Sequence, residues 1–291
     1  MRCLYPWWSE KEKAFFPCGH CFACRRAKAS EWATRLIVEL PYWSKYSFIT
    51  LTYDDEHLPI SDTSIYPTLK PKDLQDFWKR LRKCCDSKIK YFACGEYGGR
   101  FARPHYHAIV FGVGTSKEDM DTVTDCWSKG RTSNDYVNPA SINYVVGYVM
   151  KKYGTRRNDE EYTKKGLEIP FQRCSRGIGL AYALAHGADL QRDLSVRLYT
   201  GRETALPRYF VKKLGIDTEL LKNKASDGMV QMINGLFRRF KIDLEPTPAN
   251  LGYMLFHSRQ FGKSEALNNY LCELSEQKES ANKTLESFRK K

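Results

Sequence analysis

Apolar residues recur along this chain in two patterns, one with the spacing of helices and one typical of strands. Repeats at three and four residues indicate amphipathic helices, and short runs rich in β-branched and aromatic residues indicate strands. The pattern predicts helices at 22–40, 69–85, 116–127 and from 139 onwards, and strands at 46–53, 89–98, 103–112 and 131–137. The helix at 69–85 should bury one apolar stripe and expose a cationic face.

From residue 46 onwards, the predicted elements follow the order strand, helix, strand, strand, helix, strand, helix. A short polar segment with glycines joins the strands at 89–98 and 103–112, so these two should form an antiparallel hairpin. This order predicts an α+β fold of the ferredoxin-like type, in which helices pack on one face of an antiparallel sheet.

The helix that begins at Pro139 carries two tyrosines on one face. Tyr144 and Tyr148 are four residues apart, and Lys151 and Lys152 follow one turn later. Aromatic residues at this spacing usually pack into a core. A catalytic interpretation therefore needs a partner site elsewhere in the chain.

Such a site is predicted on the hairpin. His105 and His107 alternate in a strand, so both imidazoles should point to one face, and Glu96 on the preceding strand should lie opposite them. Two imidazoles and a carboxylate form an open site for a divalent metal. Thr50 and Thr52, in the strand at 46–53, are expected to have structural roles.

The charge of the chain points to a polyanionic partner. Among 291 residues, 47 are Lys or Arg and 34 are Asp or Glu, a net charge of +13, which is typical of nucleic-acid binding. No run reaches the roughly 18 apolar residues of a membrane span, and the N-terminus becomes charged before any signal-peptide region could form. We expect a cytosolic protein without membrane contact, whose cysteines are thiols or metal ligands.

The N-terminal cysteines have the spacing of zinc ligands. Cys18, Cys21 and Cys24 form two consecutive C-x-x-C motifs, and Cys3 is available as a fourth ligand. These residues predict a structural zinc site that ties the N-terminus to the following helix. The alternative is a set of unliganded thiols near the start of a helix.

Three motifs resemble those of HUH endonucleases, the rolling-circle replication initiators. They are "FITLTY" (48–53), "RPHYHAIVFG" (103–112) and "YVVGYVMKK" (144–152), in the family's order and spacing. More narrowly, "CGHCFACRRAKASEWATRL", "FITLTYDDEHLP" and "YFACGEYG" resemble the replication initiation proteins of small single-stranded DNA phages of the microvirus and gokushovirus type. The resemblance runs from about residue 18 to about residue 213.

The resemblance implies that one tyrosine cuts the origin strand, leaving a 5'-phosphotyrosyl link and a free 3'-OH. The second tyrosine then attacks the regenerated origin, and a closed circle is released. Position by position, the family motifs assign metal binding to Glu96, His105 and His107, nucleophilic attack to Tyr144 and Tyr148, and charge support to Lys152 or the adjacent Lys151. Phosphate and carboxylate oxygens favour Mg²⁺ or Mn²⁺, although two imidazoles would also accept zinc.

The resemblance further implies an HUH endonuclease domain at 46–215, with its motif core at 46–155. A cysteine-rich segment with one helix (1–45) would precede it, and a helical polar extension (216–291) would follow. Its partners would be single-stranded DNA at the replication origin and a host helicase and polymerase, in the cytoplasm of a host bacterium.

Several alternatives remain at the level of sequence. One is an HUH relaxase or transposase, and another is a non-catalytic nucleic-acid-binding protein with a zinc knuckle. A metal-dependent hydrolase is a third, although such enzymes usually recruit more His or Asp ligands. His57, in the segment after the first strand, is expected to be a loop residue rather than a third imidazole ligand.

Overall fold

The structure is a computed structural model that divides into two compact units. It describes residues 3, 6–85, 88–99, 101–152, 156–217, 219–240, 270, 273, 276 and 277. Within these ranges, the side chains of 148–152, 156–159 and several residues of 220–240 lie outside the description. The larger unit is Ala29–Leu214, and the smaller combines Met1–Lys28 with Gly215–Lys291. The expected division at residues 45 and 215 stays a prediction.

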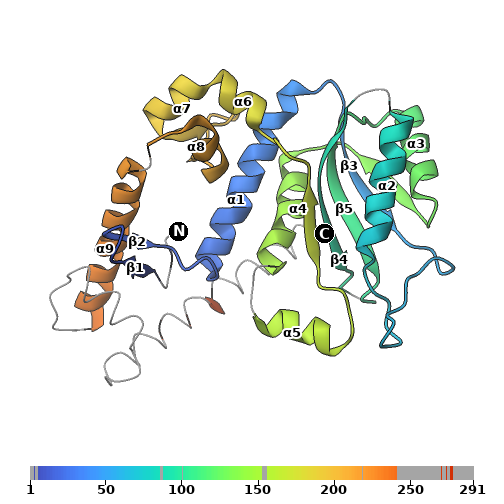
Figure 1. Ribbon diagram of the computed structural model, residues 1–291, viewed down its shortest axis with the longest axis horizontal. Coiled ribbons are helices and arrows are strands. Elements are labelled where there is room, and N and C mark those ends of the chain that lie inside the picture. Colours follow the sequence, from blue (N-terminus) through green and yellow to red (C-terminus); the bar gives the residue numbers. More distant parts are fainter. Residues whose placement is uncertain are drawn as a thin grey trace. The chain divides into compact units, whose positions relative to one another are not determined.

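An antiparallel sheet forms the centre of the larger unit (Figure 1). Its strands, in spatial order, are β6 (Thr132–Asp135), β3 (Tyr46–Thr52), β5 (Pro104–Phe111), β4 (Lys90–Tyr97) and β7 (Phe171–Cys174). All neighbouring strands in this sheet are antiparallel. The strand expected at 131–137 is confirmed as the edge strand β6, and the hairpin of β4 and β5 is also confirmed.

The α+β class is correct, but the expectation that helices cover only one face of the sheet is wrong. Helices α2 (Pro71–Cys84) and α3 (Lys117–Trp127) cover one face, whereas α1 (Phe22–Glu39) and α4 (Pro139–Lys152) cover the other (Figure 1). The reason lies in the central strand β5, where every residue except His105 is buried. A strand that is apolar on both faces needs a cover on each side.

Alternating residues of the same strands supply the two cores. Tyr106, Ala108 and Val110 belong to the cluster with α2 and α3, which also contains Phe77, Trp78 and Trp127. Ile109 and Phe111 belong to the cluster with α1 and α4, which also contains Leu36, Phe92, Val145 and Val146. The period of two along β5 therefore assigns each side chain to one helical layer.

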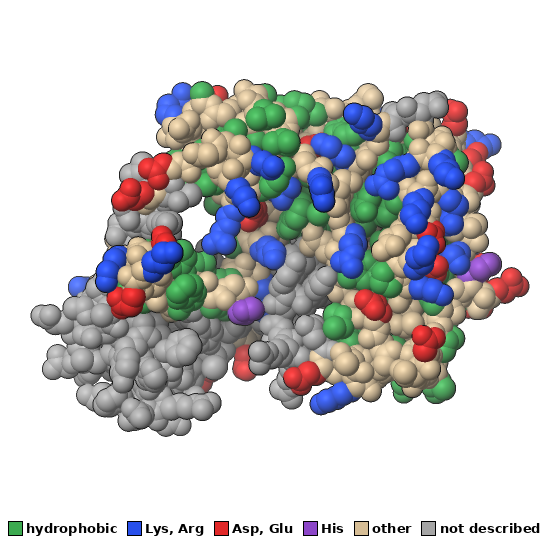
Figure 2. All heavy atoms as spheres, viewed as in Figure 1, with side chains coloured by type: hydrophobic (Ala, Val, Ile, Leu, Met, Phe, Trp, Pro, Cys, Tyr) green, Lys and Arg blue, Asp and Glu red, His purple; other side chains and the backbone are tan. Residues whose placement is uncertain are grey.

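Helix α2 exposes the cationic face that its sequence predicts. Lys72, Lys79, Arg82 and Lys83 are exposed on this helix, while Leu74, Phe77 and Leu81 are buried. Figure 2 shows Lys and Arg side chains gathered over the region of α2. No helix in the described part of the chain has the length and apolar character needed to cross a membrane.

A buried carboxylate fastens α1 to the rest of the larger unit. Glu39 accepts hydrogen bonds from the indole Nε1 of Trp43 (2.8 Å), from Lys90 Nζ on β4 (2.7 Å) and from the backbone N–H of Gly179 (2.6 Å). The remaining elements of the unit are η1 (Leu40–Tyr42), α5 (Arg156–Lys164), α6 (Leu180–Ala185), α7 (Gly187–Asp193), β8 (Ser195–Arg197), β9 (Glu203–Ala205) and α8 (Arg208–Leu214).

The smaller unit contains a short hairpin, the first turns of α1, and a long helix. Strands β1 (Trp7–Ser9) and β2 (Ala14–Phe16) pair antiparallel, with Trp7 stacked on Phe16 and Trp8 edge-on to Phe15. Helix α9 (Glu219–Phe240) contacts β2. This hairpin was not expected from the sequence, because strands of three residues leave little periodic signal.

Candidate active site

The β4–β5 hairpin brings a carboxylate and two imidazoles together. Glu96 on β4 pairs directly with His105 on β5, and His107 follows two residues later on the same face of the sheet. Directly paired residues and residues two apart on a strand share a face. The predicted cluster is therefore present, on the face of the sheet that α1 and α4 cover.

The three side chains converge on a common point. The Nε2 atom of His105 lies 3.0 Å from Oε1 of Glu96, and the Nε2 atom of His107 lies 3.4 Å from the same oxygen. Donor atoms from all three residues lie within 4.8 Å of one another. Glu96 and His107 are buried, with 7% and 6% of their surface exposed. Such a group can hold a cation.

The far nitrogen of each imidazole is held by a hydrogen bond. Nδ1 of His105 donates to the carbonyl oxygen of Arg103 at 3.0 Å, since a carbonyl can only accept. Nδ1 of His107 lies 2.9 Å from the hydroxyl of Thr50, which can accept the same kind of proton. Both Nε2 atoms then present lone pairs toward Glu96, and two acceptors at this distance require a proton or a cation between them.

Tyr144, on α4, places its phenol beside this cluster. Its hydroxyl lies 3.5 Å from Nε2 of His107, and the two rings meet edge to face with centroids 5.1 Å apart. Phe48 stacks on His107 and meets Tyr144 edge-on, so it packs against both rings. Tyr144 is 37% exposed, which leaves the phenol accessible from solvent. Packing of Val145 and Val146 against the sheet sets the orientation of this helix face.

Three other predicted site residues can be placed only by their backbone. Tyr148, Lys151 and Lys152 lie on α4 with Tyr144, but their side chains are outside the described residues. The helix expected to carry both tyrosines is therefore confirmed, while the second phenol and the two ammonium groups stay predictions.

Thr50 has a role that the sequence did not reveal. Its hydroxyl orients an imidazole of the cluster, and the pairing of Thr50 with His107 across β3 and β5 produces this contact. A threonine two residues from the end of a strand carries no signal of this kind until the register of the sheet is known. His57 is confirmed as a loop residue; its Nδ1 lies 2.8 Å from Asp54.

The smaller unit holds a second group of potential metal ligands. The sulfurs of Cys3, Cys18, Cys21 and Cys24 all lie within 4.8 Å of one another. The backbone N–H of Cys18 donates to the sulfur of Cys3 at 3.2 Å, and that of Cys21 donates to the sulfur of Cys18 at 3.3 Å. The sequence expectation that Cys3 joins the three spaced cysteines is correct in its geometry.

These four thiols share charge unequally. The hydrogen bond with Cys21 raises the pKa of Cys18, but hydrogen bonds with Cys24 and Cys3 outweigh it and lower this pKa to about 6. Hydrogen bonds to Cys18 raise the pKa of both Cys3 and Cys24 above the ordinary thiol value. One thiolate is therefore favoured, and further deprotonation at this spacing requires a cation.

Comparison with known proteins identifies the family. The model of a family described as replication-associated protein ORF2 matches residues 46–153, which include the hairpin cluster and α4. "Replication-associated protein ORF2" of Spiroplasma virus 4 is 30% identical over 219 residues, covering 68% of this chain and 67% of that protein. The chain belongs to the family of phage replication-associated proteins.

Two further relatives of this replication-associated protein also come from phages. "Replication-associated protein VP4" of Bdellovibrio phage phiMH2K is 32% identical over 216 residues, 67% of this chain and 66% of the relative. "Replication-associated protein ORF4" of Chlamydia phage 1 is 26% identical over 265 residues, 80% of this chain and 64% of the relative. The chain thus spans about two thirds of the length of each relative. No solved structure matches it significantly.

The hydrogen bond from Thr50 to His107 yields a prediction for metal affinity. Thr50→Val keeps the shape of the side chain but removes the group that orients the imidazole. Loss of such an outer partner typically weakens metal binding about 10- to 100-fold. We expect this loss in calorimetric titration of the replication-associated protein with Mn²⁺.

Thr52→Val is the matched control, because the Thr52 hydroxyl donates to the carbonyl of Arg131 rather than to a histidine. This variant should bind Mn²⁺ like the unchanged protein. Equal affinities for the Thr50 and Thr52 variants would show that the hydroxyl does not support the site.

Proposed function

We propose that this protein is a metal-dependent endonuclease and ligase of the HUH class, which nicks single-stranded DNA at a phage replication origin through a 5'-phosphotyrosyl intermediate. The observation that carries the proposal is the position of the Tyr144 hydroxyl, 3.5 Å from Nε2 of His107 within the Glu96–His105–His107 cluster. Membership of the phage replication-associated family supports a role in starting and ending rolling-circle replication.

The residues of the cluster fit a divalent cation. Glu96, His105 and His107 would hold it through one carboxylate oxygen and two Nε2 atoms, while Arg103 and Thr50 keep the opposite nitrogens engaged. Three protein donors leave room for oxygens of the DNA phosphate, which favours Mg²⁺ or Mn²⁺. When bound, such an ion withdraws electron density from the scissile phosphate and offsets charge that develops on its oxygens.

The cleavage step exchanges one phosphate ester for another. The Tyr144 Oη atom attacks phosphorus, a new P–O bond to the tyrosine forms, and the bond from phosphorus to the 3' oxygen breaks. The phenol loses its proton and the leaving 3' oxygen gains one, so the step needs no outside energy source. Because the number of phosphoester bonds is unchanged, the 3'-OH can later reverse the reaction and join DNA.

A second nucleophile completes the proposed cycle. Tyr148 lies four residues after Tyr144 on α4, a spacing that places two side chains on one helical face. One tyrosine would stay esterified to the 5' end while the other cuts the regenerated origin. Lys151 and Lys152, one turn later, would favour the phenolate form by their positive charge. Strand separation and extension would come from a host helicase and polymerase inside the infected bacterium.

The alternatives account for fewer of these observations. A nucleic-acid-binding protein without catalysis would leave no purpose for a buried Glu96 and His107 beside a phenol. A relaxase or transposase shares the chemistry, but the three relatives are named as replication-associated proteins of phages. Replication initiation is therefore the proposal that the cluster and the family support together.

Substitution of the tyrosines tests this proposal. Tyr144→Phe and Tyr148→Phe should each leave some covalent adduct with single-stranded origin DNA, since one phenol remains, but each should release few closed circles. The double variant should form no adduct, a loss of at least about 1,000-fold that is typical for removal of a covalent nucleophile. Denaturing gels of protein incubated with viral single-stranded DNA and Mn²⁺ measure both products.

Tyr199→Phe is the matched control, because Tyr199 is an exposed tyrosine in the turn between β8 and β9. It should form adduct and circles at the unchanged rate. Adduct formation by the double variant would refute the nucleophile assignment, and undiminished cleavage in excess chelator would refute the role of the metal.

We further propose that Cys3, Cys18, Cys21 and Cys24 bind one structural Zn²⁺. Four thiolates are a common ligand set for tetrahedral structural zinc, and the N–H donors of Cys18 and Cys21 stabilise negative sulfur. A zinc ion here would join the extreme N-terminus to the start of α1 and would hold the smaller unit's cysteine segment in place.

Elemental analysis tests the zinc proposal. Protein purified without chelator should contain about one zinc per chain, and the Cys21→Ser and Cys24→Ser double variant should contain none and unfold at lower temperature. Cys174→Ser, an exposed cysteine outside this group, is the control and should keep its zinc. A zinc content near zero in the unchanged protein would contradict the proposal.

A further inference from the structure

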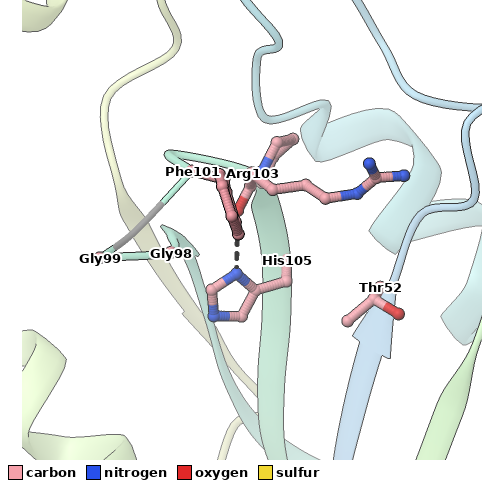
Figure 3. A pocket seen from close by; sticks show the side chains of 7 residues that line it. Thr52, Gly98, Gly99, Phe101, Arg103 and His105 are labelled. Atoms are coloured by element: carbon pink, nitrogen blue, oxygen red, sulfur yellow. Dashed lines mark hydrogen bonds between the residues drawn. The ribbon is translucent and has the colours of Figure 1, made fainter.

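A small open pocket lies directly beside the metal cluster. It has a volume of about 280 Å³ and is lined by Thr52, Phe101, Arg103, Pro104, His105 and the glycine pair 98–99. Figure 3 shows His105 at the base of the loop that carries Phe101 and Arg103, with Thr52 on the adjacent strand. Because His105 belongs to both the pocket and the cluster, a group bound in the pocket would lie next to a phosphate held at the cluster.

The ring at this pocket is unusually accessible. Phe101 is 76% exposed, although it lies on a tight connection rather than a long loop. The connection is closed by two backbone hydrogen bonds, from Gly98 N–H to Arg103 O (3.0 Å) and from Ala102 N–H to Gly98 O (2.9 Å). Ala102 adopts a positive φ of 48°, a conformation that costs energy for a residue with a Cβ. The turn therefore holds an apolar ring beside the site at some cost.

The chemistry of the pocket suits a flat, mostly uncharged group. Arg103 does not offer a free charge to it, because its guanidinium donates to Asp55 (2.7 Å) and to the carbonyl of Tyr53 (2.8 Å). The wall consists of an aromatic ring, a proline ring, an imidazole and glycines without side chains. The volume lies just below the roughly 300–1,000 Å³ of pockets that take drug-sized ligands, so one ring system of a nucleotide fits better than a larger group.

We propose that this pocket binds the nucleobase of a nucleotide flanking the scissile phosphate, with Phe101 stacked on the base. The inference rests on the proposed function for the identity of the ligand as single-stranded DNA. Stacking on aromatic side chains is the usual way in which proteins grip unpaired bases, and it tolerates different bases because each has a flat face. Phe101 is then a positioning residue, which sets which phosphodiester reaches the cluster.

An abasic scan tests the pocket. The probes are single-stranded oligonucleotides with the viral sequence that the protein binds most tightly, each lacking the base at one position. Affinity is measured without added divalent cation, so the assay does not depend on cleavage. For the unchanged protein, loss of one base should weaken binding about 5- to 150-fold. For Phe101→Ala, loss of the same base should change affinity less than about twofold, because the stacking partner is already absent.

Two control variants separate stacking from other effects. Phe101→Trp keeps an aromatic face and should keep the dependence on that base. Tyr199→Ala removes another exposed ring, distant in sequence from the pocket, and should reproduce the profile of the unchanged protein. Unchanged melting temperatures would confirm that the Phe101 variants fold normally, as expected for a side chain that is largely exposed.

The outcomes distinguish the pocket from the proposed function. If Phe101→Ala and the unchanged protein show the same dependence at every position, the pocket proposal is wrong, even if the protein nicks DNA. If one position depends on Phe101 but no cleavage occurs with Mn²⁺, the pocket binds a base and the proposed nicking activity is wrong.

Discussion

The register of the β4–β5 hairpin is the constraint on which the site depends. Glu96 meets His105, and His107 points to the same face, only because these strands pair as they do. A slip of one residue would turn the imidazoles to the opposite face of the sheet. The buried side chains prevent such a slip, because Tyr106 and Ile109 must each face their own helical layer. Ordinary core packing therefore also determines the geometry of a polar site.

The second constraint is that polar groups occupy an otherwise apolar face. Glu96 and His107 are buried beside Phe48 and under α4, where an unpaired charge is costly. Hydrogen bonds from Thr50 and Arg103 satisfy the outer nitrogens, and the inner donor atoms remain directed at one another. The same packing that buries Val145 and Val146 brings Tyr144 to the edge of this cluster. A nucleophile and a cation site are thus assembled without a flexible loop.

The parts of this structure that could be predicted from sequence are those set by local pattern. Alternation along β5 indicated that His105 and His107 share a face, and the short connection indicated that Glu96 lies opposite them. Helical spacing located α4 and Tyr144, and paired C-x-x-C motifs indicated the group that Cys3 completes. The resemblance to microvirus-type replication initiators also proved correct.

The parts that could not be predicted depend on contacts between distant segments. Thr50 meets His107 across strands that are far apart in sequence, and the edge strand β7 pairs with β4 from still farther along the chain. The cover that α1 and α4 provide on the second face was missed, because the count of elements considered the sheet and its connections alone. An exposed ring such as Phe101 gains meaning only from the pocket beside it.

The central claim is that the metal cluster on the hairpin serves a tyrosine nucleophile on α4. Mass spectrometry of peptides from a trapped protein–DNA adduct tests it most directly. The account predicts a nucleotide attached through its 5'-phosphate to Tyr144 or Tyr148, and no adduct when His105 and His107 are replaced by Ala. A nucleotide on any other residue, or an adduct that forms without the two histidines, would contradict the account.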